Sequence, residues 1–299
     1  MQRLWRKIQH GRRPWATTFL AGATAFWLAA GVVDMAAAQA VEPLLDKALA
    51  GDHRSAANRK RDVYRHPRET LLFFGLKPDM AVLEIWPGGG WYSEILAPVL
   101  RDNGKLYLAH SAIEDPRLPN WQREAREKQE AAYAKRPELY GKPVFTSLGP
   151  PDYLSIAPPA SMDMVLTFRN VHNWSAQKPG AQNANAPRID ALVFKAFFDV
   201  LKPGGILGVV EHRAHSGTSF EQQIKTGYMT EEYVIGLAEK AGFKLLAKSE
   251  VNANARDTKD HPNGVWTLPP MSRGRLDPEK YLAIGESDRM TLKFEKPAK

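Results

Sequence analysis

The chain has 299 residues, with 41 lysines and arginines against 33 aspartates and glutamates, and it contains no cysteine. The lack of cysteine excludes disulfides, a thiolate nucleophile and any Cys-ligated zinc or iron–sulfur site. Five of the basic residues and one of the acidic residues fall within the first 40 positions, which leaves 36 against 32 in the remainder. So small an excess of positive charge does not predict a nucleic-acid partner.

The first 40 residues have the three parts of a secretory signal. A basic patch that ends at Arg12-Arg13 precedes an uncharged run from Trp15 to Val33, and Ala38-Gln39-Ala40 offers a small-x-small cleavage site. We therefore expect residues 1–40 to be a signal peptide and the mature protein to be periplasmic. The paired arginines point to the twin-arginine pathway as a route of export. Because the uncharged run is long enough to span a bilayer, an uncleaved inner-membrane anchor is the alternative, and membrane contact is expected only through this segment.

Residues 41–80 are expected to form an N-terminal helical segment ahead of the main domain, residues 81–299. A short helix is predicted over 41–50, and residues 52–74 show helical patches that are broken at His66-Pro67. The basic cluster in this segment is expected to be a solvated helix face, with a cover over a binding site as the alternative. Its members are Arg59, Arg61, Asp62, Arg65 and His66.

The main domain alternates strand-like and helix-like segments. Strands are predicted at 80–86, 105–109, 144–147, 162–168, 206–210, 244–251 and 290–295. Helices are predicted at 91–100, 120–136, 189–201 and 231–241, with Thr230 as a cap and Gly242 as a stop. This alternation indicates an α/β domain with a mostly parallel sheet covered by helices on both faces.

The junction after the first strand is the most informative stretch. Glu84 lies near the end of the strand, and Gly88, Gly89 and Gly90 follow it. Glycines at such a corner let the backbone turn sharply and approach a ligand closely. A nicotinamide-binding Gly-x-Gly-x-x-Gly would need glycine at 86 and 91, and both are tryptophan, so an oxidoreductase of that type is not indicated.

This junction resembles motif I of class I S-adenosylmethionine (SAM) dependent methyltransferases, which reads acid-x-Gly-x-Gly-x-Gly. Glu84, Gly88 and Gly90 match the pattern, and Trp86 stands where the first glycine is expected. The resemblance extends over residues 55–296, and residues 201–211 are its second strong segment. It implies a Rossmann-like fold whose seven-stranded, mostly parallel sheet has an antiparallel last strand.

The signal segment, together with Phe-Arg-Asn-x-His at 168–172, more narrowly resembles predicted exported bacterial methyltransferases. The implied cofactor is SAM. Its candidate contacts are Glu84, Trp86, Gly88, Gly89, Gly90, His110 and Asn170. The family usually has an acid after the second strand that binds the ribose hydroxyls. Here His110-Ser111 occupies that place and the first acid is Glu114, so either Glu114 folds back or the cofactor is held less tightly.

Polar residues also follow the fourth and fifth strands, where ligands of a parallel sheet bind. Arg169, Asn170 and His172 follow the fourth, and Glu211 and His212 end the fifth. His172 and Glu211 are the candidate catalytic residues, because either could take a proton from an acceptor. The histidines show no His-x-x-x-His or other metal spacing, so no metal site is expected.

The sequence therefore predicts methyl transfer from SAM to a small-molecule or lipid-like acceptor. The alternative is a non-catalytic exported protein that binds a ligand on a methyltransferase fold. It is favoured by the missing acid after the second strand and by the cytoplasmic origin of SAM. The sequence identifies neither the acceptor nor the oligomeric state.

Overall fold

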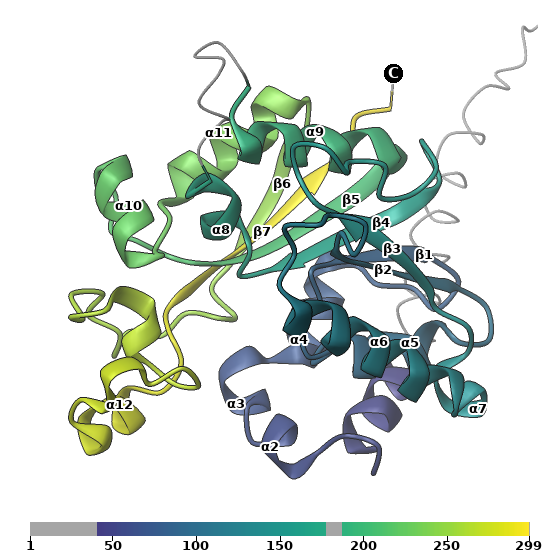
Figure 1. Ribbon diagram of the computed structural model, residues 1–299, viewed down its shortest axis with the longest axis horizontal. Helices are drawn as coiled ribbons and strands as arrows, with labels where there is room; N and C mark the ends of the chain where they lie inside the picture. Colours follow the sequence, from purple (N-terminus) through teal and green to yellow (C-terminus); the bar gives the residue numbers. More distant parts are fainter. Residues whose placement is uncertain (1–40, 178–186, 299) are drawn as a thin grey trace, which may run out of the picture. The chain divides into compact units, whose positions relative to one another are not determined.

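The computed structural model describes residues 41–177 and 187–298, so the signal peptide predicted at 1–40 lies outside the described residues. Within them, one seven-stranded sheet has the order β3-β2-β1-β4-β5-β7-β6 (Figure 1). The strands are β1 (Ala81–Ile85), β2 (Lys105–Ser111), β3 (Val144–Leu148), β4 (Met162–Phe168), β5 (Leu201–His212), β6 (Lys244–Ser249) and β7 (Arg289–Glu295). The first five pair in parallel, and β7 runs antiparallel to both β5 and β6. The predicted fold class is confirmed.

Helices connect and cover these strands. Beyond a helix over residues 41–50, they are α2 (Ala56–Arg59), α3 (Asp62–Arg65), α4 (Pro67–Phe74), α5 (Ser93–Leu100), α6 (Asn120–Ala134), α7 (Pro137–Tyr140), α8 (Val171–Ser175), α9 (Ile189–Val200), α10 (Phe220–Thr226), α11 (Glu231–Ala241) and α12 (Pro278–Ile284), with single 3₁₀ turns η1 (Gly264–Thr267) and η2 (Arg273–Arg275). In the described part of the chain, no helix combines the length and the apolar character needed to span a membrane.

The sheet has a separate core on each face. Side chains that alternate along β1 separate to opposite faces: Leu83 packs with α9 and α11, whereas Val82 packs with α4 and α5. Figure 1 shows α9 and α11 on one side of the sheet and α4, α5 and α6 on the other. Val41 and Leu45 belong to the second core, so the N-terminal helix is packed against the same sheet.

Local signals explain several element boundaries. The Thr230 side chain accepts a hydrogen bond from the backbone N–H of Tyr233 and caps α11, and Gly242 ends the helix with φ of 106°. His66, with φ of 38°, separates α3 from α4, which starts at Pro67. The strand predicted at 206–210 is longer than expected, because Leu201 already pairs with Met162 across a bulge.

Short helices appear at positions where the sequence predicted none. α8 follows β4 directly, and α10 follows β5. The long insertion between β6 and β7 contains η1, η2 and α12. These elements follow the carboxyl ends of β4 and β5 or precede β7, and α8, η1 and η2 supply walls of the site described next.

Candidate functional site

The chain leaves β1 through a corner built from left-handed backbone. Trp86, Gly88 and Gly90 have φ of 45°, 59° and 79°, respectively. Glycine takes this conformation without steric cost, whereas a tryptophan is strained in it. The three positions of the motif I pattern after the acid therefore share one backbone conformation, although the first is not glycine.

The indole N–H groups of the corner are both bonded to backbone carbonyls, and the two side chains line the space beside the glycines without filling it. Trp86 donates its Nε1–H to the carbonyl of Leu148 (3.0 Å) and packs on Trp174. Trp91 donates its Nε1–H to the carbonyl of Asn58 (3.0 Å). Trp86 thus has a packing role, and cavities remain on two sides of the corner.

We call the first cavity the β2 hollow. It has a volume of about 650 Å³, a size usual for small-molecule sites. Its walls are the corner, the end of β2 and α6, with Gly88, Gly89, Gly90, His110, Trp121, Gln129 and Tyr133 among its residues. A Cβ atom at Gly88 or Gly89 would meet no atom within 4 Å, so bare backbone faces open space there.

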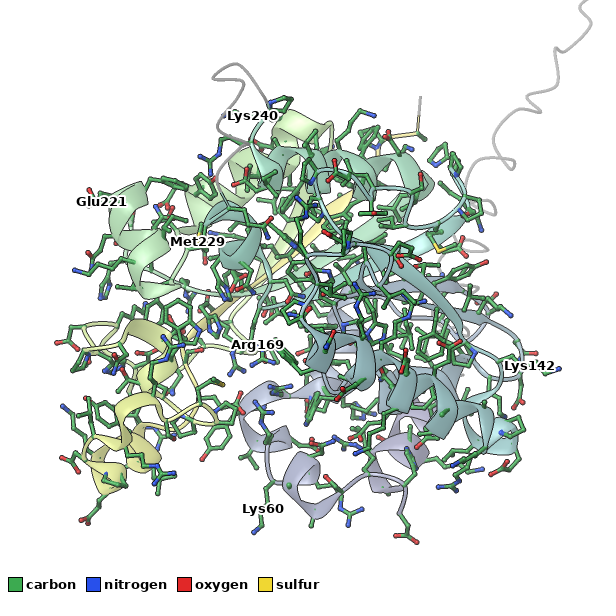
Figure 2. The ribbon with its side chains drawn as sticks, viewed as in Figure 1. Lys60, Lys142, Arg169, Glu221, Met229 and Lys240 are labelled. Carbon is green, nitrogen blue, oxygen red and sulfur yellow. The ribbon has the colours of Figure 1, made fainter. Side chains whose placement is uncertain are left out.

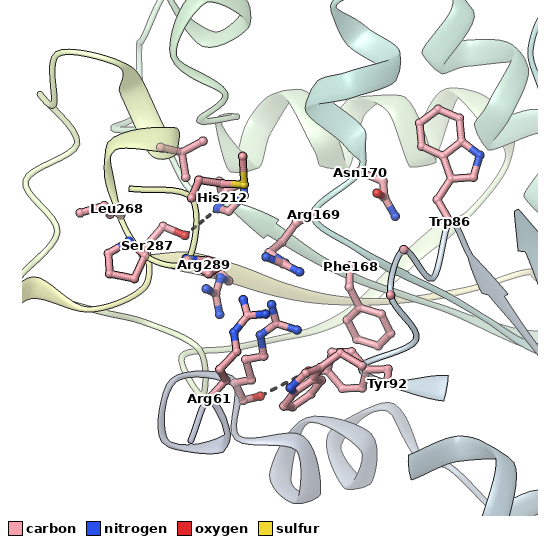
Figure 3. A pocket seen from close by; sticks show the side chains of 18 of the residues that line it. Arg61, Trp86, Tyr92, Phe168, Arg169, Asn170, His212, Leu268, Ser287 and Arg289 are labelled. Carbon is pink, nitrogen blue, oxygen red and sulfur yellow. Dashed lines mark hydrogen bonds between the residues drawn. The ribbon is translucent and has the colours of Figure 1, made fainter. Parts of the chain in front are cut away.

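We call the second cavity the arginine hollow; its volume is about 390 Å³. It shares Trp86, Gly88, Gly89 and Asn170 with the β2 hollow, so the two adjoin at the corner. Figure 3 shows Arg61, Arg169, His212 and Arg289 converging on it. Residues of the insertion between β6 and β7, including Trp266 and Met271, form the opposite wall.

Glu84 lies at the floor of the corner. It is 2% exposed, lines the arginine hollow and accepts a hydrogen bond from Ser93 Oγ at 2.6 Å. Burial raises the pKa of Glu84 to about 7, and the Ser93 bond offsets this only in part. The acid of the predicted motif is therefore readily switched between its neutral and charged forms near neutral pH.

His110 takes the place where the resembled family has an acid. It stacks on Phe145, lines the β2 hollow, and its buried Nε2 has no hydrogen-bond partner among the described residues. Burial and the nearby Arg126 lower the pKa of His110 to about 4, so the imidazole is neutral. Glu114 is not part of this cavity, and the suggestion that it folds back is not supported.

Gln129, on α6, is a site residue that the sequence did not indicate. Its buried Oε1 has no partner among the described residues, and its Nε2 lies where a Cβ at Gly90 would be. The side chain thus fills the space between the corner and α6. Nothing in the regular helical pattern of 120–136 singled out this glutamine.

Asn170 and His172 follow β4, as the sequence predicted. Asn170 donates from Nδ2 to the carbonyl of Ile85 (2.9 Å) and lines both hollows. His172 lies in the first turn of α8 and lines the arginine hollow, and its Nδ1 lies 3.0 Å from Glu211 Oε1. The structure therefore brings the two candidate catalytic residues into direct contact.

Glu211 itself is enclosed. It has no exposed surface, and its Oε2 accepts the N–H of Val171 while its Oε1 accepts the N–H of His212. Neither hollow includes it. Any effect of Glu211 on a ligand must therefore pass through His172, whose ring it orients.

His212, the neighbour of Glu211 on β5, reaches the arginine hollow and lies 2.6 Å from Ser287 Oγ through Nδ1 (Figure 3). Burial and then the charges of His172 and Arg289 lower the pKa of His212 well below its ordinary value. The ligand atoms of His172, Glu211 and His212 lie within 4.8 Å of one another, a convergence that spacing in the sequence could not reveal. Both Glu211 oxygens already accept hydrogen bonds, so a metal ion there would have to displace them.

The prediction that the basic cluster before β1 is a solvated helix face is wrong for Arg61 and Arg65, whereas Arg59 is exposed. Arg65 is 2% exposed, and both Arg61 and Arg65 line the arginine hollow. Asp62 instead pairs with Arg54. The helices α2 and α3 are too short to show a clear apolar face, so their inward side was not evident from the sequence.

Comparison with known proteins gives matches in structure and none in sequence. No protein-family model matches the chain, and no curated protein matches it. The [4+2]-cyclase SpnF is 17% identical, with a TM-score of 0.53 over 84% of this chain and 86% of that one. A SAM dependent methyltransferase from Aquifex aeolicus is 18% identical, with a TM-score of 0.47 over 79% and 93%. The 1,6-didemethyltoxoflavin-N1-methyltransferase of Burkholderia thailandensis is 13% identical, with a TM-score of 0.45 over 95% and 94%.

The chain has the Rossmann-like fold of SpnF. At these identities the likeness concerns the fold alone. SpnF is named as a cyclase, and two of the other solved structures are named as methyltransferases. The reaction must therefore be argued from the site.

Proposed function

We propose that this protein binds SAM at the corner after β1 and transfers its methyl group to a small-molecule acceptor. The observation that carries the proposal is the conformation of Trp86, Gly88 and Gly90, which opens bare backbone onto a cavity of about 650 Å³. The named solved structures that are methyltransferases agree with it.

The β2 hollow suits the nucleoside part of the cofactor. Tyr133 and Trp121 supply aromatic wall, and the neutral His110 with Gln129 supplies polar atoms without partners among the described residues. A ribose hydroxyl can both donate and accept a hydrogen bond, so these two neutral side chains replace the usual carboxylate. Glu84, which lines the arginine hollow, would balance positive charge on the amino acid end of the cofactor.

When bound, SAM supplies an electrophilic methyl group. The protein has to hold an acceptor in line with it on the side of the arginine hollow, and such positioning provides much of the rate. His172 lies there, with Nδ1 held by Glu211, so Nε2 is the atom that can take a proton from the acceptor. Glu211 acts as a positioning residue.

The cellular setting belongs to the same proposal. The sequence of residues 1–40 supports export to the periplasm, by the twin-arginine route or with an uncleaved anchor, and a place among exported bacterial methyltransferases. We propose no nucleic-acid partner, since residues 41–299 carry only a small excess of positive charge.

A non-catalytic ligand-binding role is the second candidate. It is favoured by His110, which replaces the acid that the resembled family uses for the ribose. Incubation with SAM carrying a trideuterated methyl group and a small-molecule extract separates the two. Mass-labelled products formed in excess over the protein support methyl transfer, whereas SAM binding without turnover supports the second role. Absence of both contradicts the proposal.

A further inference from the structure

The arginine hollow contains more positive charge than its own structure uses. Three arginines surround the buried Glu286, which is 2% exposed. Arg61 donates to its Oε1 at 2.5 Å, Arg65 donates to its Oε2 at 3.3 Å, and Arg289 also donates to Oε2. Burial would raise the pKa of Glu286, but Arg289, Arg65 and Arg61 together bring it to about 2. One carboxylate thus stands against three guanidinium groups.

Arg169 adds a fourth guanidinium without a counter-charge of its own. Within residues 41–177 and 187–298, its side chain has no hydrogen bond or ion pair. Its side chain is partly buried and lines the arginine hollow (Figure 2 and Figure 3). Burial, followed by the charges of Arg65 and Arg289, lowers the pKa of Arg169 well below its ordinary value. A desolvated charge without a partner destabilises the folded protein, which indicates that Arg169 serves to bind a ligand and not to stabilise the fold.

Several N–H groups of these arginines also lack partners. Arg61 Nη2, Arg65 Nη2 and Arg289 Nε are buried and have no hydrogen-bond partner in the described part of the chain. A buried donor without a partner is costly, and planar guanidinium groups suit the oxygens of carboxylates and phosphates. The cluster therefore has unpaired hydrogen-bond donors that can bind an oxyanion.

The location connects this cluster to the proposed reaction. The arginine hollow adjoins the corner through Gly88 and Gly89 and contains His172. Trp266 and Met271 on the opposite wall offer apolar surface beside the charges. A metal ion at His172, Glu211 and His212 would face four guanidinium groups, so the electrostatic field favours an anion over a cation.

From these contacts we propose that the acceptor is an anionic small molecule whose carboxylate or phosphate group binds Arg169, Arg65 and Arg289. The inference rests on the proposed function, in that the same molecule presents its nucleophile to His172 and the corner. Its negative charge would also attract the positively charged sulfonium of the cofactor.

Arg169 can be tested without removing a contact of the fold. Because its side chain makes no hydrogen bond or ion pair in the described chain, Arg169→Gln should leave the melting temperature unchanged or raise it. Arg275→Gln is the matched control, since Arg275 is an exposed arginine with a similar left-handed φ, 48° against 62°. Arg169→Lys restores the charge without the planar fork.

The probes are inorganic phosphate and acetate, titrated into the full chain by calorimetry and thermal shift at constant ionic strength in chloride. We expect saturable binding of one or both, weakened about tenfold or more by Arg169→Gln, partly restored in Arg169→Lys and unchanged in Arg275→Gln. Preference for one anion identifies the acid group. If neither anion binds beyond chloride, or Arg169→Gln binds like the wild type, the inference is wrong.

A parallel titration with SAM keeps this test separate from the proposed function. The methionine carboxylate of SAM is itself an anion. If it occupied the cluster, Arg169→Gln would weaken SAM, and phosphate would compete with SAM, which would also overturn the inference. Unchanged SAM affinity in Arg169→Gln supports it. Loss of SAM binding in the wild type, with anion binding intact, would instead count against the proposed function alone.

Discussion

His172 and Glu211, from α8 and β5, meet through Nδ1 and Oε1 at 3.0 Å, with Glu211 fully buried. The sequence left open which of these two residues takes a proton from the acceptor, and this contact gives them different roles. The carboxylate fixes the ring, and the ring faces the arginine hollow. The same division occurs wherever a buried acid orients a histidine that transfers a proton.

The dyad leads to a prediction on rate. With any acceptor that the protein methylates, His172→Gln should lower kcat by roughly a hundredfold to ten-thousandfold and leave SAM affinity nearly unchanged. Glu211→Gln should lower kcat and also destabilise the fold by about 1–3 kcal/mol, because its oxygens accept backbone N–H groups that start α8. Full activity of His172→Gln under single-turnover conditions would remove the histidine from the proton role.

Gly88 in the corner has a matched control in Gly217, which lies between β5 and α10. Gly88 and Gly217 have φ of 59° and 78°, and a Cβ at either would meet no atom within 4 Å. Gly88→Ala and Gly217→Ala should therefore destabilise the protein by a similar amount, about 1–2 kcal/mol. Only Gly88→Ala should weaken SAM binding, measured by calorimetry, because its methyl group projects into the cavities. Equal SAM affinity in the two variants would place the cofactor elsewhere.

Much of the fold was predictable, and the site was predictable where it follows strands. The strands and their parallel pairing came from apolar runs that alternate with helical segments, and Glu84, His110 and His172 were found because they end or follow strands. The contact between Arg65 and Glu286 was not predictable, since the two residues are 221 positions apart and meet only through the fold. Gln129 was missed because a polar residue on a charged helix looks the same whether it faces solvent or a cavity.

Glu84 makes stability depend on pH in a definite direction. Its pKa in the folded protein is about 7, above the ordinary 4.5, so the folded state holds an extra proton between these values. The contribution of Glu84 to stability should be greatest below about pH 4.5 and decrease by up to about 3 kcal/mol as the pH rises to 7. Glu84→Gln should remove this decrease in urea unfolding curves, whereas Glu239→Gln, on the exposed side of α11, should retain it.

The same carboxyl should report cofactor binding. Because a cationic ligand favours the charged form of Glu84, SAM binding near pH 6 should release up to one proton. Calorimetry in buffers of different ionisation enthalpy measures that proton. Release of an equal amount by Glu84→Gln would show that another group is responsible.

His110 should have the opposite effect on stability. Its pKa in the folded protein is about 4 against an ordinary 6.5, so stability should decrease as the pH falls from about 6.5 to 4. His110→Phe should remove this decrease and weaken SAM about tenfold, since the ring loses its polar atoms. Unchanged SAM affinity would mean that the neutral imidazole does not serve as the ribose contact.

Calorimetric titration of the full chain with SAM tests the central claim most directly. The account predicts saturable binding of one molecule per chain, accompanied by a rise in melting temperature. No heat and no thermal shift at millimolar SAM would contradict it.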